Sequence, residues 1–99
     1  MDKIYKALAE INRRKILFWQ GLGELNVSQI VNKLDLSQAT VSNHLSILRK
    51  SKLVDYRIKG KERIYKLNEE MAKQYLIELN RLLSVSGATN MADEIIIRR

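Results

Sequence analysis

The sequence contains no cysteine and no proline, and only one of its 99 residues is histidine. Without thiols the chain can form no disulfide, no thiolate metal site and no thiol redox switch. No apolar run approaches the roughly 20 residues that span a membrane, and the charged first segment does not fit a secretory signal peptide. We therefore expect a cytoplasmic protein with no membrane contact.

The chain also has little material for a core. A single domain of this length buries only about 60–65% of the surface that its unfolded chain exposes. Because no disulfide can reinforce it, dimerisation is the simplest remaining way to bury more apolar surface.

Negative charge is scarce in one part of the chain. The net charge is +7, and the segment 49–66 holds eight basic and two acidic residues, so nearly all of the excess lies there. A clustered excess favours a polyanionic partner such as nucleic acid, whose counterions are released on binding. A merely solubilising face is the alternative.

Two helices are expected at the start of the chain. Apolar residues recur at spacings of three and four and predict a helix over 3–10. Asn12 is a good N-cap, so a second helix is predicted over 13–21, stopped by Gly21 and Gly23.

The next two predicted helices are short and close together. Asn26, with Gln29 three residues later, resembles a capping box for a helix that ends near Leu34. Ser37 would cap a further helix over 38–50. Two short helices joined by a tight turn predict a helix-turn-helix.

The pattern then changes from helical to alternating. Segments 53–58 and 63–67 are rich in aromatic and β-branched residues and predict a hairpin around Gly60. Asn68 would cap a last long helix.

This order predicts a mainly α fold with a small β-hairpin, a winged helix-turn-helix of order α-α-α-α-β-β-α. We expect residues 1–86 to form the DNA-binding and dimerisation domain. Residues 87–99 form a C-terminal tail for which a docked helix, a partner-binding strand and a disordered end all stay open.

The helix over 38–50 carries the clearest functional signal. Val41, His44, Leu45 and Leu48 share one face and predict its buried side. The other face has short, mostly uncharged side chains, which rank low in helix propensity but suit close approach to base edges. The predicted DNA-reading residues are Ser37, Gln38, Ala39, Thr40, Ser42, Asn43 and Ser46.

The hairpin supplies a second candidate contact. Lys59, Lys61 and Arg63 crowd its tip and return strand, where they would hold the DNA backbone or enter a minor groove. An edge hairpin protected by lysines against aggregation is the alternative. The basic run 13–15 is a weaker candidate for DNA contact. The lone His44 is expected to pack or hydrogen-bond rather than to bind a metal.

At this point the sequence resembles the ArsR-type family of winged-helix repressors. The residues that carry the resemblance are Lys6–Ala9, Asn12–Leu17, Glu24-Leu25 with Val27, Leu36–Leu48, Leu53-Val54, Gly60 and Ile64–Leu67. The run Ser-Gln-x-Thr-Val-Ser-x-His-Leu is the most specific part. The resemblance implies a homodimer built on the first and last helices that binds an operator with two-fold symmetry. The family's recognition positions carry over onto Gln38, Ala39, Thr40, Ser42 and Asn43.

The sequence departs from this family where metals bind. Asn26 and Ser28 stand where many members carry two metal-sensing cysteines, and the last helix has no histidine. We therefore expect no metal site and no cofactor. Glu10-Ile11-Asn12 replaces a common Asp-Pro-Thr, with Asn12 keeping the cap.

The first and last helices each have an apolar stripe that a small monomer cannot cover. The residues expected at a two-fold dimer interface are Ile4, Tyr5, Leu8, Tyr75, Leu79 and Leu82. Packing of these stripes within one protomer is the alternative.

Together these features predict a repressor that binds double-stranded DNA at an inverted repeat and occludes a promoter. Its release would come from an unknown effector, a protein partner or dilution. A winged-helix protein-interaction module of the anti-repressor type and a non-specific nucleic-acid-binding protein stay open as alternatives. No paired carboxylates, nucleophile–base set or glycine-rich phosphate loop points to an enzyme.

Overall fold

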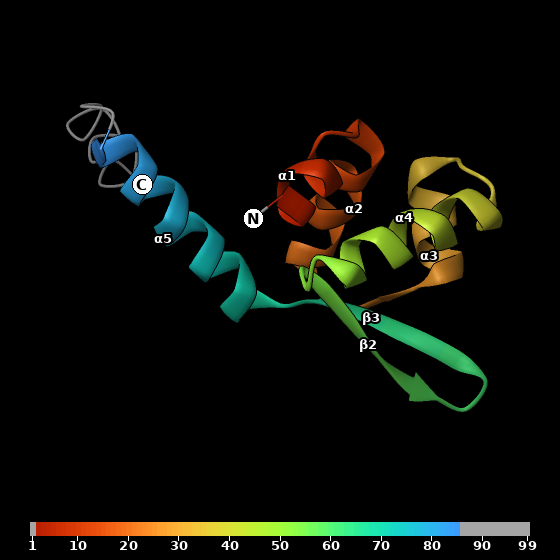
Figure 1. The fold of residues 1–99 in the computed structure, drawn as a ribbon. Helices are drawn as coiled ribbons and strands as arrows, with labels where there is room; N and C mark the ends of the chain where they lie inside the picture. The colour runs from red at the N-terminus through yellow and green to blue at the C-terminus, as the bar shows by residue number, and fades with distance from the viewer. Residues whose placement is uncertain (1, 86–99) are drawn as a thin grey trace. The chain divides into compact units, whose positions relative to one another are not determined.

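The computed structural model describes residues 2–85, which fall into two units, residues 2–69 and the last helix (Figure 1). Each unit is described by itself. Among the described residues, none of the helices combines the length and the apolar character needed to span a bilayer. The tail predicted over 87–99 lies outside the described residues.

The first two helices are α1 (Asp2–Leu8) and α2 (Ile11–Leu22), so both begin earlier than predicted. The predicted cap at Asn12 is wrong, because Glu10 is the N-cap and its carboxylate accepts a hydrogen bond from the Arg13 backbone N–H at 3.0 Å. Asn12 lies inside the first turn and donates its side-chain amide to Glu10 at 3.3 Å. The carboxylate two residues upstream thus takes the role that the sequence pattern gave to the amide.

The predicted helix-turn-helix is present, as α3 (Val27–Leu34) and α4 (Gln38–Lys50). The capping box of α3 forms as predicted, with Asn26 and Gln29 exchanging two hydrogen bonds of 2.8 Å. Asp35 ends α3 in the left-handed conformation, at φ 54°. Ser37 caps α4 by accepting a hydrogen bond from the Thr40 N–H at 3.1 Å.

Helix α4 ends in a Schellman arrangement. The backbone N–H of Leu53 donates to the Leu48 carbonyl at 3.1 Å, and that of Lys52 donates to Arg49 at 2.9 Å. This turn requires the left-handed conformation at Lys52, with φ at 67°. A non-glycine residue therefore occupies a position that glycine would adopt with less strain.

The predicted hairpin consists of β2 (Val54–Lys59) and β3 (Glu62–Leu67), joined by a turn in which Gly60 has a φ of 64°. A third strand, β1 (Leu25–Asn26), was not predicted, and it pairs antiparallel with β3 to give the sheet order β1-β3-β2. The hairpin extends beyond helices α1–α4 as the wing (Figure 1).

The core of the first unit lies where the helices meet the base of the wing. Its largest fully buried side chains come from α2, α3, α4 and β2, and they are Ile16, Ile30, Val41, Leu45, Leu48 and Val54. Each such side chain stabilises the fold by roughly 1.5–3 kcal/mol relative to an exposed one. This packing fixes which side of α4 faces outward.

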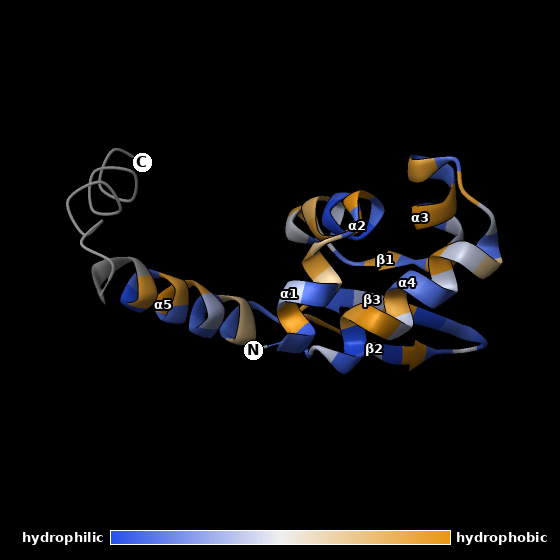
Figure 2. Cartoon of the chain, turned by 45° about the horizontal axis from the view of Figure 1, so that its top comes forward, coloured by the Kyte–Doolittle hydropathy of each residue, from blue (hydrophilic) through white to orange (hydrophobic). Residues whose placement is uncertain are grey.

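The last helix, α5 (Glu69–Val85), begins directly after Asn68 as predicted. Hydrophobic and hydrophilic residues recur along its length (Figure 2). Within the described chain, several of its large apolar side chains are exposed, namely Leu76, Ile77, Leu79 and Leu82.

Candidate nucleic-acid interface

Helix α4 presents the predicted polar face to solvent. Val41, Leu45 and Leu48 are completely buried and anchor the helix to the core. All of the residues predicted to read DNA are exposed, including Ser42 and Asn43 at the centre of the face. No Asp, Glu, Lys or Arg occurs between Leu36 and Leu48, so this exposed face carries no formal side-chain charge.

Two of the exposed side chains on this face are engaged in hydrogen bonds within the protein. The Ser37 hydroxyl donates to Thr40 Oγ1 at 2.8 Å and also accepts from the Thr40 backbone N–H. Both side chains therefore help to begin α4. Gln38, Ser42 and Ser46 lie on the side of α4 that borders the wing.

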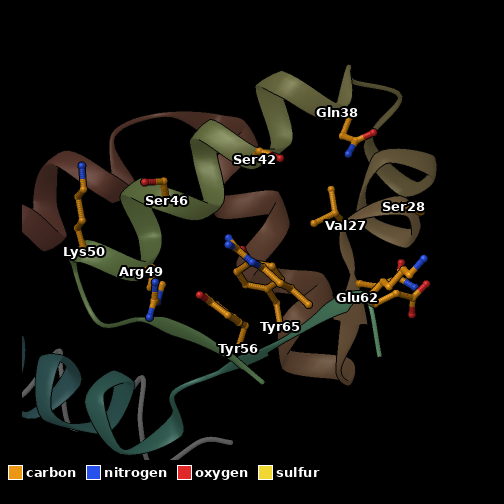
Figure 3. Close-up of a pocket in the computed structure, with 13 residues that line it drawn as sticks. Val27, Ser28, Gln38, Ser42, Ser46, Arg49, Lys50, Tyr56, Glu62 and Tyr65 are labelled. Atoms are coloured by element: carbon orange, nitrogen blue, oxygen red, sulfur yellow. The ribbon is translucent and has the colours of Figure 1, made fainter. Parts of the chain in front are cut away.

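A hollow lies between α4, the start of α3 and the wing (Figure 3). Helix α4 contributes Gln38, Ser42, Ser46, Arg49 and Lys50. The wing contributes Tyr56, Lys61, Glu62, Arg63 and Tyr65. Three of the predicted reading residues and two of the predicted wing cations thus border one concave surface. Lys59 and Asn43 are exposed but do not line it.

Eight residues of this surface were not predicted as site residues, among them Arg49, Lys50 and Tyr56. A signal for Arg49 existed, because it follows Ser42 by seven positions and Ser46 by three, which places all three on one side of a helix. Tyr56 had no such signal, since its contacts join elements that are separate in the sequence.

Arg13 and Arg14, the weaker candidates for DNA contact, hold the end of α1. Arg13 donates from Nε to the Ala7 carbonyl at 2.7 Å and from Nη2 to that of Lys6 at 3.0 Å. Arg14 donates to the Leu8 carbonyl at 2.6 Å. Cations at a helix C-terminus satisfy its free carbonyls and complement its dipole.

His44 is buried on the inner side of α4, where the sequence pattern predicted it. Its Nε2 lies 3.7 Å from a Glu10 carboxylate oxygen and its Nδ1 lies 3.4 Å from Arg13 Nη1. This cluster connects the α1–α2 junction to the back of the DNA-reading helix.

Two ionisable groups of the first unit have displaced pKa values. Desolvation raises the pKa of Glu10, but hydrogen bonds from the backbone N–H groups of Arg13 and Asn12, with the charges of His44 and Arg13, outweigh it and leave that pKa below its ordinary value. A hydrogen bond with Tyr65 is the largest of the effects that raise the pKa of Arg63, which stays a cation.

The comparisons with known proteins agree with this geometry. A model of the family "bacterial regulatory protein, arsR family" matches residues 11–56. The chain is 40% identical over 73 residues to a cadmium resistance transcriptional regulatory protein CadC homolog of Staphylococcus aureus. That match covers 73% of this chain and 60% of the relative. The chain is also 31% identical to the transcriptional repressor SdpR of Bacillus subtilis, over 69% of this chain and 76% of the relative.

Solved structures show the same fold. The homodimeric winged helix-turn-helix DNA-binding domain Mb0332 of Mycobacterium bovis, a possible ArsR-family transcriptional regulator, superposes with a TM-score of 0.69 and 26% identity. The match covers 87% of this chain and 82% of that one.

The fold and the exposed α4 therefore define a winged helix-turn-helix transcriptional regulator of the DNA-binding class. The chain belongs to the arsR family of bacterial regulatory proteins.

Proposed function

We propose that this chain is a cytoplasmic repressor that binds an inverted-repeat operator as a homodimer. Helix α4 lies in the major groove, and the wing contacts the sugar–phosphate backbone. The observation that carries the proposal is the exposed, uncharged face of α4, whose opposite face is fully buried.

The chemistry of the side chains indicates which residues read bases and which bind phosphates. Gln38 and Asn43 can pair bidentately with adenine, and the serines of α4 can donate to or accept from base edges. Lys59, Lys61 and Arg63 are exposed cations on the wing, suited to phosphates rather than to particular bases. Charge at the wing supplies affinity, while the uncharged face of α4 supplies sequence preference.

A homodimeric relative and exposed apolar side chains support a homodimer. The Mycobacterium bovis relative is described as homodimeric. Helix α5 exposes Leu79 and Leu82, and Tyr5 of α1 is also exposed. Ile4 is buried inside its own unit, so Tyr5 and Leu8 offer more surface to a partner than Ile4 does. We propose that Tyr5 and Leu8 of α1 pack with Tyr75, Leu79 and Leu82 across a two-fold axis.

The release signal we propose is not a soft metal. Such a site needs thiolate or imidazole donors, and the sequence has no cysteine and one histidine. That histidine, His44, lies against Glu10 and Arg13 in the core. We also propose that the chain has no catalytic activity, in keeping with relatives that are named as transcriptional regulators.

Selection of bound duplexes from a random pool tests the proposal. The expected result is an inverted repeat whose half-sites are one helical turn, about 34 Å, apart, because a two-fold dimer presents its reading helices at that spacing. Binding without any enriched sequence would instead indicate a non-specific nucleic-acid-binding protein. Failure to bind any duplex would favour a protein-interaction module.

Sedimentation at micromolar concentration tests the dimer separately. The expected species has twice the mass of the chain. A monomer under conditions where the duplex is bound would contradict the two-fold arrangement.

A further inference from the structure

Tyr56 is the residue through which the wing meets the end of α4. The Arg49 guanidinium carbon lies 4.3 Å from the centroid of the Tyr56 ring. The Arg63 guanidinium carbon lies 4.7 Å from the same centroid. Guanidinium groups are attracted to an aromatic face at such distances. One cation from the DNA-reading helix and one from the wing are therefore held over a single ring.

The ring itself is held in place by the sheet. Tyr56 on β2 pairs in register with Tyr65 on β3, and the two ring centroids are 5.3 Å apart. Tyr65 is buried, with 6% of its surface exposed. Because Tyr65 belongs to the core, Tyr56 packs against a side chain that is itself held in place. Both guanidinium groups are thus drawn toward the same ring before any ligand arrives.

Bringing two cations together is unfavourable unless an anion joins them. The two guanidinium carbons are at most about 9 Å apart, since both lie close to the same centroid. Asp55 offers one negative charge, with a carboxylate oxygen 3.5 Å from Arg49 Nε. Both partners of that pair are more than half exposed, so water screens it and it contributes little.

We propose that Arg49 and Arg63 together bind a single phosphate of the DNA backbone, at a site that the Tyr56 ring assembles. A phosphodiester has the charge and the oxygen geometry to accept hydrogen bonds from two guanidinium groups. Arg49 shares its side of α4 with Ser42 and Ser46, so this phosphate lies at the edge of the groove that α4 reads. The inference rests on the proposed DNA binding and adds a site that joins the helix to the wing.

A double-variant cycle on DNA affinity tests whether the two arginines share one phosphate. The single variants Arg49→Ala and Arg63→Ala should each weaken binding, and the double variant should be little weaker than the worse single one. The plot of log affinity against log salt should become shallower by about 1.8 in the double variant, because the dimer loses one phosphate contact, worth about 0.9, from each of its two protomers. A loss of about 3.6, with additive effects, would mean two separate phosphates in each protomer and would overturn the inference.

Lys59 offers a matched control. It is an exposed wing cation that does not line the hollow, so the effects of Lys59→Ala and Arg49→Ala should add. If the effects of Lys59→Ala and Arg49→Ala were as far from additive as those of Arg49→Ala and Arg63→Ala, the coupling would not indicate a shared phosphate site.

The role of the ring is tested by Tyr56→Phe and Tyr56→Leu. The Phe variant keeps the aromatic face and should bind DNA as the unaltered chain does. The Leu variant should bind roughly fivefold to thirtyfold more weakly, with little change in the salt slope because both cations remain. Equal binding by the Leu variant would refute the assembling role. Asp55→Asn removes a competing carboxylate without touching the ring, and should tighten binding.

These measurements are made on both a selected duplex and a random-sequence duplex, because a phosphate site does not depend on base sequence. If the effects of the Arg49 and Arg63 substitutions on affinity for random DNA are not additive, the shared site is supported even if no operator is enriched. Additive effects on a duplex that is specifically bound overturn the site and leave the proposed function standing. Binding to no duplex at all overturns both.

Discussion

Arg13 should be a determinant of stability rather than of DNA binding. Its guanidinium group donates to the carbonyls of Ala7 and Lys6, at 2.7 and 3.0 Å, and lies 3.4 Å from His44. The substitution Arg13→Ala removes these contacts together and leaves the carbonyls of Ala7 and Lys6 without a side-chain donor. The orientation of α1 relative to α4 should become less well fixed.

The expected magnitude follows from the two carbonyl contacts. A hydrogen bond from a charged donor contributes about 1.5–3 kcal/mol. One of these bonds is only partly buried and the other is exposed, so their values fall toward the lower end. We expect Arg13→Ala to lower the free energy of unfolding by about 2–3 kcal/mol, which corresponds to roughly 8–24 °C in Tm for a chain of this size.

Urea denaturation at a fixed protein concentration measures this change, because a dimer's apparent stability varies with concentration. Arg14→Ala is the matched control, since it removes the same charge but only one exposed hydrogen bond, and should lower the free energy by less than about 1 kcal/mol. Under conditions where both variants are folded, the salt slope of DNA binding should equal that of the unaltered chain. Equal destabilisation by the two substitutions, or a shallower slope for Arg13→Ala alone, would refute the structural role.

Three further predictions concern single positions. Lys52→Gly should raise the free energy of unfolding by about 0.5–1 kcal/mol, because glycine adopts the left-handed conformation at that turn without strain, and a lowered urea midpoint would contradict this. Glu10→Gln should reduce stability at neutral pH and flatten its acid dependence. The folded-state pKa of Glu10 is below the ordinary value of 4.5, so its carboxylate stabilises the fold above that pH and the contribution disappears as the pH falls through the lowered pKa. Unfolding curves recorded from neutral pH to below pH 4 would detect the difference, and parallel curves for the two proteins would argue against it. Leu79→Glu should shift the sedimenting species from dimer to monomer, whereas Gln74→Glu, an exposed change of the same charge on α5, should not. A dimer in both variants would remove Leu79 from the interface.

The local signals in the sequence were sufficient for most of the fold. The capping box at Asn26 and the cap at Ser37 each act within three residues, so the sequence alone predicted where α3 and α4 begin. The burial of Val41 and Leu45 followed from helical spacing, and the turn at Gly60 from its flanking strands. These features depend on neighbours along the chain.

The remaining features depend on contacts between distant residues. Asn12 is the better helix cap by residue type, yet Glu10 caps α2. The Glu10 carboxylate also lies 3.7 Å from His44, which comes 34 positions later. The strand β1 has only two residues, too few to show any alternation, and exists because it pairs with β3. Tyr56 could not be singled out either, because its partners Arg49 and Arg63 come from a helix and from the opposite strand.

One comparison tests the central division between base-reading and backbone-holding residues most directly. Duplexes are selected from a random pool with the unaltered chain, with Asn43→Ala and with Lys61→Ala. The Lys61 variant should enrich the same inverted repeat, with a salt slope shallower by about one for each protomer, or about two for the dimer. The Asn43 variant should accept other bases at one position of each half-site, losing about 1–3 kcal/mol of discrimination there. Identical enriched sequences from both variants would contradict the placement of α4 in the major groove.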